Sequence, residues 1–173
     1  MIFETERLYL REMSEGDLMS LGKILQDKEV MYAYEHAFSD EEAYLWLNNQ
    51  LSRYKKYGFG LWAVVLKETN EFIGQCGITM QKYGDREVPE IGYLFRKDFW
   101  HRGFAAEAAS ACKKYAFEVL GFEEVYSIIR VNNEPSKKVA ERNGMHPVDT
   151  LIKHYYNMDM PHIVYKTVKS ERR

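Results

Sequence analysis

The sequence predicts one domain of the α/β (α+β) class, in which helices cover both faces of a mixed, mostly antiparallel sheet. Three observations lead to this class. The chain has 173 residues, which is the size of a single domain, so residues 1–173 are taken as one unit. Segments with strand periodicity alternate with helical ones in the order β-α-α-β-β-β-α-β-α-β-β. One pair of strands is separated by a whole helix, which predicts a βαβ crossover near the centre of the sheet.

The first half begins with a strand and two helices. Leucines alternate with other residues within 7–13, which is the pattern of a half-buried strand. Each helix begins where a serine, Ser14 or Ser39, stands three residues before an acidic residue. Apolar residues then recur at helical spacing behind each serine, and Gly58 ends the second helix.

Strands follow the second helix. Residues 61–67 and 72–79 are rich in β-forming residues and are separated by a four-residue polar turn, so they form an antiparallel hairpin. Gly74 and Gly77 inside the second arm predict a bulge or a close approach of another backbone.

The second half contains the βαβ crossover and a closing hairpin. A near-continuous apolar strand at 125–131 is typical of burial on both faces. The last residues, 169–173, are polar and are expected to fray. The remaining expected elements are a polar loop at 82–87, a strand at 88–95 with Pro89 near its start, an alanine-rich helix capped by Gly121, a short helix at 136–142 behind Pro135, and strands at 151–156 and 162–168 flanking a turn at 157–161.

Composition excludes several classes of protein. Lys plus Arg is 24 and Asp plus Glu is 26, so the chain lacks the basic surplus of a nucleic-acid binder. No apolar run reaches the roughly 18 residues that span a bilayer, and acidic residues stand where a signal peptide would be basic. Cys76 and Cys112 are too few for a disulfide framework or a zinc site. We therefore expect a reduced, cytoplasmic protein without a nucleic-acid or membrane partner.

The most informative segment is a glycine-bearing loop, residues 100–105, between a strand and a helix. The first amides of a helix have no partner within the helix, so they form an anion site. Gly103 lets an anion approach the backbone, and Arg102 adds a positive charge. This arrangement suits a diphosphate. The loop matches neither the Walker A pattern nor the three-glycine dinucleotide pattern.

Two motifs resemble the GNAT acyltransferases. RGFAAEA, residues 102–108, resembles their pyrophosphate loop, although Trp100 stands where Gln or Arg is commonest; this variant is similar to the ribosomal-protein N-acetyltransferase branch. NEPSKKVAERNGM, residues 133–145, resembles the family's second conserved segment. The resemblance covers nearly the whole chain and implies the GNAT acyl-CoA N-acyltransferase fold.

The resemblance implies acetyl-CoA as the acetyl donor and no metal. Backbone groups of Leu94, Phe95 and Arg96 would bind the pantetheine arm as an added strand. Asn133 and Ser136 would contact the same arm near its sulfur. The residues expected around the pyrophosphate are His101, Arg102, Gly103, Phe104, Ala105, Ala106 and Glu107.

Acetyl transfer to an amine needs a base for the amine and a proton or hydrogen bond for the departing thiolate. Glu90 is the base that the resemblance implies, and a simple structural ion pair is the alternative. Many relatives carry an acidic tyrosine where Ala140 stands, so Ser136 is the expected substitute, with Tyr155 or Tyr156 as the alternative. An amide near Leu94 would bind the oxyanion. No nucleophile is placed for an acyl-enzyme, so transfer is expected to be direct.

The acceptor is expected to be a primary amine, either a protein N-terminus or a small molecule. Relatives bind it in the segment that holds Tyr32, Tyr34 and Glu35, whose rings and carboxylate suit a cationic amine, although packing explains these rings equally well. A homodimer is common among relatives. Two rival functions stay open: a non-catalytic CoA-binding sensor or regulatory module of the same fold, and an unrelated phosphate-binding α/β protein.

Overall fold

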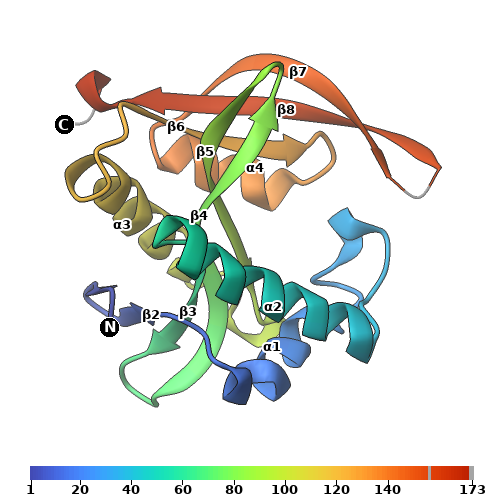
Figure 1. Ribbon diagram of the computed structural model, residues 1–173, viewed down its shortest axis with the longest axis vertical. Coiled ribbons are helices and arrows are strands. Elements are labelled where there is room, and N and C mark those ends of the chain that lie inside the picture. The colour runs from blue at the N-terminus through green and yellow to red at the C-terminus, as the bar shows by residue number, and fades with distance from the viewer. Residues whose placement is uncertain (156, 172–173) are drawn as a thin grey trace.

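A computed structural model, which describes residues 1–155 and 157–171, confirms the predicted fold class. Figure 1 shows a twisted sheet with helices on either side of it. The strand order is β1-β2-β3-β4-β5-β6-β8-β7, and β5 and β6 are parallel while the other neighbours are antiparallel. The strands are β1 (Phe3–Glu4), β2 (Leu8–Arg11), β3 (Leu61–Leu66), β4 (Glu71–Tyr83), β5 (Arg86–Phe95), β6 (Glu124–Arg130), β7 (His146–Tyr155) and β8 (Met158–Val168).

Two pairs of helices form the outer layers. The α-helices are α1 (Leu18–Leu25), α2 (Asp40–Tyr57), α3 (Phe104–Glu118) and α4 (Glu134–Arg142), and the short 3₁₀ turns are η1 (Glu15–Asp17), η2 (Tyr32–Tyr34), η3 (Lys97–Phe99) and η4 (Lys169–Glu171). The predicted helix signals are confirmed for α2, because the Ser39 hydroxyl accepts from the Glu42 amide and Gly58 ends the helix with φ of 80°. No helix in the described residues is long and apolar enough to cross a bilayer.

Alternate residues of β3 separate two hydrophobic layers. Trp62 and Val64 pack with α3 on one face of the sheet. Leu61 and Ala63 pack with α1 and α2 on the other face. This alternation is the two-residue period of a strand, and it fixes which side chains of the central strands can meet a ligand on each face.

The glycines of β4 permit a close approach, as predicted. A Cβ atom on Gly77 would lie 2.0 Å from the Gly60 carbonyl oxygen, and one on Gly74 would lie 2.5 Å from the Phe95 ring. The register between β3 and β4 also shifts by one residue between Val64 and Val65.

Two predicted turns are wrong in position. The polar segment 82–87 is mostly strand, because β4 and β5 continue to a tight turn at Gly84 and Asp85. The predicted turn at 157–161 lies mostly within β8. In both hairpins the strands extend beyond the helical layers. Polar residues there are held in the strands by backbone hydrogen bonds to the neighbouring strand. They form no alternating buried stripe from which the sequence would predict a strand.

The start of the chain and one cap also differ from the predictions. β1 is an additional short strand, and β2 covers only the centre of the predicted first strand. Helix α3 ends at Glu118 with Val119 as its cap, and Gly121, with φ of 77°, turns the chain two residues later. Residues 169–171 form a 3₁₀ turn in which the Lys169 amide donates to the Glu123 carbonyl, and fraying of the tail stays a prediction. The rest of the predicted tail lies outside the described residues.

Candidate active site

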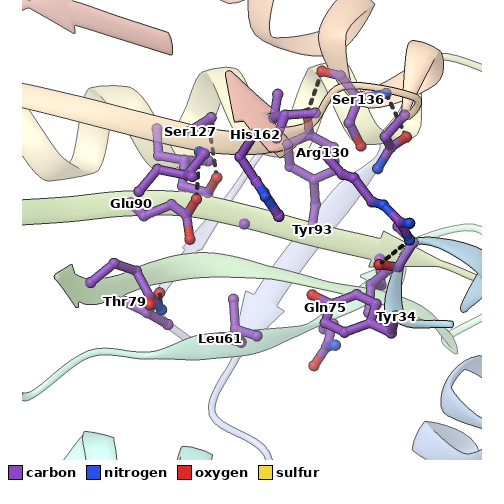
Figure 2. A pocket seen from close by; sticks show the side chains of 18 of the residues that line it. Tyr34, Leu61, Gln75, Thr79, Glu90, Tyr93, Ser127, Arg130, Ser136 and His162 are labelled. Atoms are coloured by element: carbon purple, nitrogen blue, oxygen red, sulfur yellow. Dashed lines mark hydrogen bonds between the residues drawn. The ribbon is translucent and has the colours of Figure 1, made fainter. Parts of the chain in front are cut away.

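The candidate site is a cavity of about 410 Å³ where β5 and β6 diverge. The two strands pair at Glu90 and Tyr126. Beyond that point side chains bridge the gap, because the Ile128 amide donates to Glu90 and the Ser127 hydroxyl donates to the Ile91 carbonyl oxygen. In Figure 2, Glu90 and Ser136 lie towards opposite sides of the view, with Tyr93 and His162 between them.

Alternation along β5 determines which backbone groups face this gap. The Arg96 amide donates to Ile73 of β4, and β4 and β5 keep one register from Gly74 to Tyr83. Even-numbered residues therefore direct their amides and carbonyls towards β4, and Tyr93 and Phe95 direct theirs towards the gap. The Phe95 carbonyl already accepts from the Trp100 indole at 2.9 Å. The Tyr93 backbone and the Phe95 amide are thus the groups that this part of β5 turns to the gap.

Glu90 is a carboxylate held deep between the layers. Its Oε2 accepts from the Ile128 amide at 2.6 Å. Burial raises the pKa of Glu90 above its ordinary value, and the positive charges of Lys153 and Arg53 together with the amide bond offset this only in part. A raised pKa suits a group that must accept a proton near neutral pH.

The other end of the cavity is built around the start of α4. Asn133 caps the helix, since its side chain accepts from the Ser136 amide at 3.3 Å. The Tyr32 hydroxyl donates to the same Asn133 oxygen at 2.9 Å. The Tyr93 hydroxyl donates to the Ser136 carbonyl at 2.8 Å, and burial raises the pKa of Tyr93 well above its ordinary value. Tyr93 therefore joins β5 to the residue predicted to meet the sulfur.

The segment predicted to bind the acceptor, residues 32–38, contributes Ala33, Tyr34 and Phe38 to the cavity wall. Tyr34 lines the wall and makes an edge contact with Trp46 of α2. Glu35 instead forms an ion pair with Arg130 of β6. Together with the bond from Tyr32 to Asn133, this pair attaches the segment to the β6–α4 connection, and the Glu35 charge is already neutralised.

The predicted anion loop forms the start of α3. Gly103 is the N-cap with φ of 80°, and His101 has φ of 62°. The Glu107 amide donates back to Gly103, so the amides of 104–106 are those without an intrahelical partner. The Glu107 side chain binds the N-terminal segment: it accepts from the Thr5 hydroxyl at 2.5 Å and from Arg7 Nε at 2.8 Å.

The predicted site residues divide into two groups. Glu90, Leu94, Asn133, Ser136 and Tyr34 line the cavity. The others in the described part of the chain do not line it: Tyr32, Glu35, Phe95, Arg96, His101, Arg102, Gly103, Phe104, Ala105, Ala106 and Glu107. The alternative Tyr155 does line it, and Tyr156 lies outside the described residues.

Several charged or titratable side chains in the wall escape the sequence reasoning, and three of them surround Glu90 or face it from other elements. Arg53 comes from α2, Lys153 from β7 and His162 from β8. His162 Nδ1 lies 2.7 Å from the Met160 carbonyl, and since a carbonyl only accepts, Nδ1 carries the hydrogen and Nε2 is left as an acceptor. Burial lowers the pKa of His162, and Lys153 and Arg130 lower it further. No spacing in the sequence relates these three positions, so only the fold reveals them.

Comparisons with known proteins agree with this fold. A family model described as "Acetyltransferase (GNAT) domain" matches residues 7–146. The Bacillus subtilis protein named "Uncharacterized protein YkkB" is 38% identical over 150 residues, which cover 86% of this chain and 87% of that protein. A solved GNAT-family acetyltransferase from Bacillus anthracis has a TM-score of 0.81 at 26% identity and covers 96% of this chain and 98% of its own.

One further solved structure bears on the predicted branch. It is described as RimL, a ribosomal L7/L12 alpha-N-protein acetyltransferase in complex with coenzyme A. Its TM-score is 0.81 at 17% identity, with 99% of both chains covered. At this identity the likeness shows the fold alone.

Proposed function

This chain belongs to the GNAT acetyltransferase family, and we propose that it transfers an acetyl group from acetyl-CoA to a primary amine by direct attack on the thioester. The observation that carries the proposal is the cavity at the divergence of β5 and β6, which joins Ser136 at one end to the half-buried Glu90 at the other. A base and a hydroxyl in one enclosed space are what amine acetylation needs.

The residues around the cavity fit acetyl-CoA as a co-substrate. Gly103, with φ of 80°, opens the start of α3, whose unpaired amides suit the pyrophosphate, and Arg102 lies beside them. The backbone of Tyr93 and the Phe95 amide face the gap and suit the pantetheine arm, in the manner expected for Leu94, Phe95 and Arg96. The Arg96 amide donates to Ile73, and Leu94 has the same orientation towards β4, so this arrangement favours the Tyr93 backbone over those of Leu94 and Arg96.

Glu90, Ser136 and Tyr93 each have a role in the proposed transfer. Acetyl-CoA supplies an acetyl thioester whose carbonyl carbon forms the new C–N bond while its C–S bond breaks. Glu90 takes the proton that the amine loses, directly or through one water. The Ser136 hydroxyl donates a hydrogen bond to the departing sulfur, and the Tyr93 amide donates to the oxyanion. Tyr93 is also a positioning residue, because its hydroxyl holds the start of α4.

The acceptor is a protein N-terminus or a small-molecule amine. The RGFAAEA segment at 102–108 resembles the ribosomal-protein N-acetyltransferases, and a protein of that branch shares the fold. The sequence resemblance supports the α-amine of a protein N-terminus, while the shared fold by itself does not choose between the acceptors. Cytoplasmic location and a homodimer stay predictions.

Turnover of acetyl-CoA with a pool of primary amines tests the proposal. We expect release of the CoA thiol together with a mass increase of one acetyl group on at least one amine, both detected by mass spectrometry. Binding of acetyl-CoA without release of thiol in any pool would instead favour the sensor module. Displacement of CoA by ATP at equal concentration would favour an unrelated phosphate-binding protein.

A further inference from the structure

We propose that Arg53 and Lys153 bind a carboxylate of the acceptor, so that the amine substrate is an amino acid or a similar small amino-carboxylate rather than a polyamine. The inference rests on the proposed function, since it concerns the acceptor of that same site. The observation behind it is the excess of positive side chains in the described cavity wall.

Three permanent cations line the cavity, and one is already neutralised. Arg130 pairs with Glu35. Within residues 1–155 and 157–171, Arg53 and Lys153 form no ion pair and no side-chain hydrogen bond, although both side chains are only partly exposed. They come from α2 and β7, two separate elements of the wall. Two unpaired cations in one small cavity indicate an anionic ligand.

The only carboxylate in the described wall does not balance them. Both cations are close enough to lower the pKa of Glu90, but burial outweighs them and raises it. When Glu90 accepts a proton from the substrate, its negative charge disappears and the cations remain. His162 cannot balance the two cations, because an imidazole is either neutral or positive, and burial lowers its pKa.

Arg53 and Lys153 share the cavity wall with Glu90 and act on it electrostatically, and this arrangement limits the geometry of the substrate. An amine whose proton goes to Glu90 must lie beside that carboxylate. A carboxylate one or two carbon atoms from the amine would then reach the same cations, which is the arrangement in an α- or β-amino acid. The cavity of about 410 Å³ must also hold the thioester end of the donor, so the acceptor is small. A polyamine would bring a second positive charge towards Arg53 and Lys153 and would be repelled.

The same cations assist the reaction. A positive environment disfavours the ammonium form of the bound amine and lowers its pKa. The neutral amine, which is the nucleophile, is therefore favoured once the carboxylate is bound.

The test compares matched pairs of amines by release of the CoA thiol. The panel contains the twenty amino acids, their carboxamides and spermidine, each assayed with saturating acetyl-CoA. An amide's ammonium has a lower pKa than that of the parent amino acid, so amides present more free amine at one pH. A preference for the carboxylate cannot then come from amine availability. Calorimetry with acetyl-CoA is run alongside.

Variants connect the preference to the two cations. We expect kcat/KM for an amino acid to exceed that for its amide at least tenfold. Arg53→Gln and Lys153→Gln, which lie on different elements, should each raise KM for the amino acid about tenfold and leave KM for the amide within twofold. Lys55→Gln, an exposed neighbour on α2, is the matched control and should change neither value more than twofold.

Two results overturn the inference while the proposed function stands: amides or spermidine acetylated as well as the amino acids, or variants that change acid and amide equally. Bound acetyl-CoA with no amino acid acetylated also overturns the inference. The transfer itself is overturned only if the wider pool of primary amines, with peptide N-termini included, gives no acetylated product either. Melting curves of the variants separate misfolding from loss of recognition.

Discussion

Glu90 shows how its surroundings change the chemistry of a single residue. The sequence places a carboxylate near the start of a central strand, which supports a base but equally a surface ion pair. The structure holds that carboxylate among α2, β6 and β7, where burial raises its pKa. Its identity as a base candidate was predictable from a resemblance, but its electrostatic setting was not, because Arg53 and Lys153 come from distant parts of the chain.

Glu90→Gln should reduce kcat about 100-fold and leave acetyl-CoA affinity unchanged, because only the proton acceptor is removed. In the parent enzyme, kcat should rise with pH through a pKa above the ordinary glutamate value. The variant should lose this pH-dependent rise. Calorimetry and a pH–rate profile measure both. Glu87→Gln, an exposed position on the same strand, is the control. Equal turnover by Glu90→Gln would remove this residue as the base.

The same substitution should also change stability with a defined sign. A carboxyl whose pKa is raised in the folded state stabilises the fold at low pH, and that contribution is lost as pH rises through the raised value. Glutamine is neutral at every pH. Glu90→Gln should therefore melt at a higher temperature than the parent at pH 8, with the difference shrinking at pH 5. A lower melting temperature at pH 8 would contradict the account of Glu90 burial.

Glu107 is the opposite case. Burial alone would raise its pKa, but hydrogen bonds from Thr5 and Arg7 outweigh burial and hold the pKa below its ordinary value. Glu107→Gln should lower the free energy of unfolding by about 1–2 kcal/mol at pH 7, since it breaks charge-assisted bonds to a partly exposed arginine. The loss should shrink as pH falls through the lowered pKa of Glu107 and vanish below it, where the carboxyl of the folded parent is also protonated. Urea unfolding at pH 7 and pH 3 measures this, with the exposed Glu6→Gln as control.

Helix α3 has a glycine with positive φ at each end, and only the one at its start lies at the proposed ligand site. Gly103 has φ of 80° at the N-cap, and Gly121 has φ of 77° just beyond the C-terminus. A Cβ on Gly103 would lie 3.4 Å from Arg7 Nη2, at the proposed pyrophosphate site, and one on Gly121 would meet open space. The strain of substitution is therefore similar, and only one of the two positions concerns a ligand.

Gly103→Ala and Gly121→Ala should each lower stability by about 1 kcal/mol, because alanine is strained in the left-handed region. Gly103→Ala alone should weaken CoA binding, since its methyl group stands where the backbone receives an anion. Thermal melts and calorimetric titration with CoA separate the two effects. Equal CoA affinity in both variants would move the pyrophosphate away from α3.

The hairpins show the limit of periodicity at the level of elements. The helices and central strands have an apolar stripe and were predictable. The outer part of β4–β5 lacks one, and it is held instead by contacts such as the Tyr83 hydroxyl on Asp149 at 2.7 Å and Arg86 on Glu124 at 2.8 Å. In the sequence, polar residues of a strand that extends beyond the helical layers have the composition of a loop. The turn predicted at 82–87 was therefore too long.

The whole molecule is a single sheet whose central divergence forms the site. Because β5 and β6 separate beyond Glu90, a ligand there would connect the half of the sheet that packs with α1 and α2 to the half that carries α4. Ligand binding should therefore be seen in global stability and not only in a loop.

Acetyl-CoA at about 100 times its dissociation constant should stabilise the fold by about 2.7 kcal/mol, which is about 5–10 °C in melting temperature for a chain of this size. ATP at the same concentration should shift it much less, because it lacks the pantetheine arm. Thermal melts with each ligand measure this. Equal shifts with both ligands would support a general nucleotide site.

The sequence by itself determined the fold class, the order of the central elements, the helix starts and the glycine loop before α3, because each depends on local periodicity, capping or backbone freedom. Only the tertiary structure decided which side chains surround Glu90 and which backbone groups of β5 face the gap. Those properties arise where α2, β6, β7 and β8 meet. Residues as far apart as Arg53 and Lys153 come together there through packing that no local pattern records.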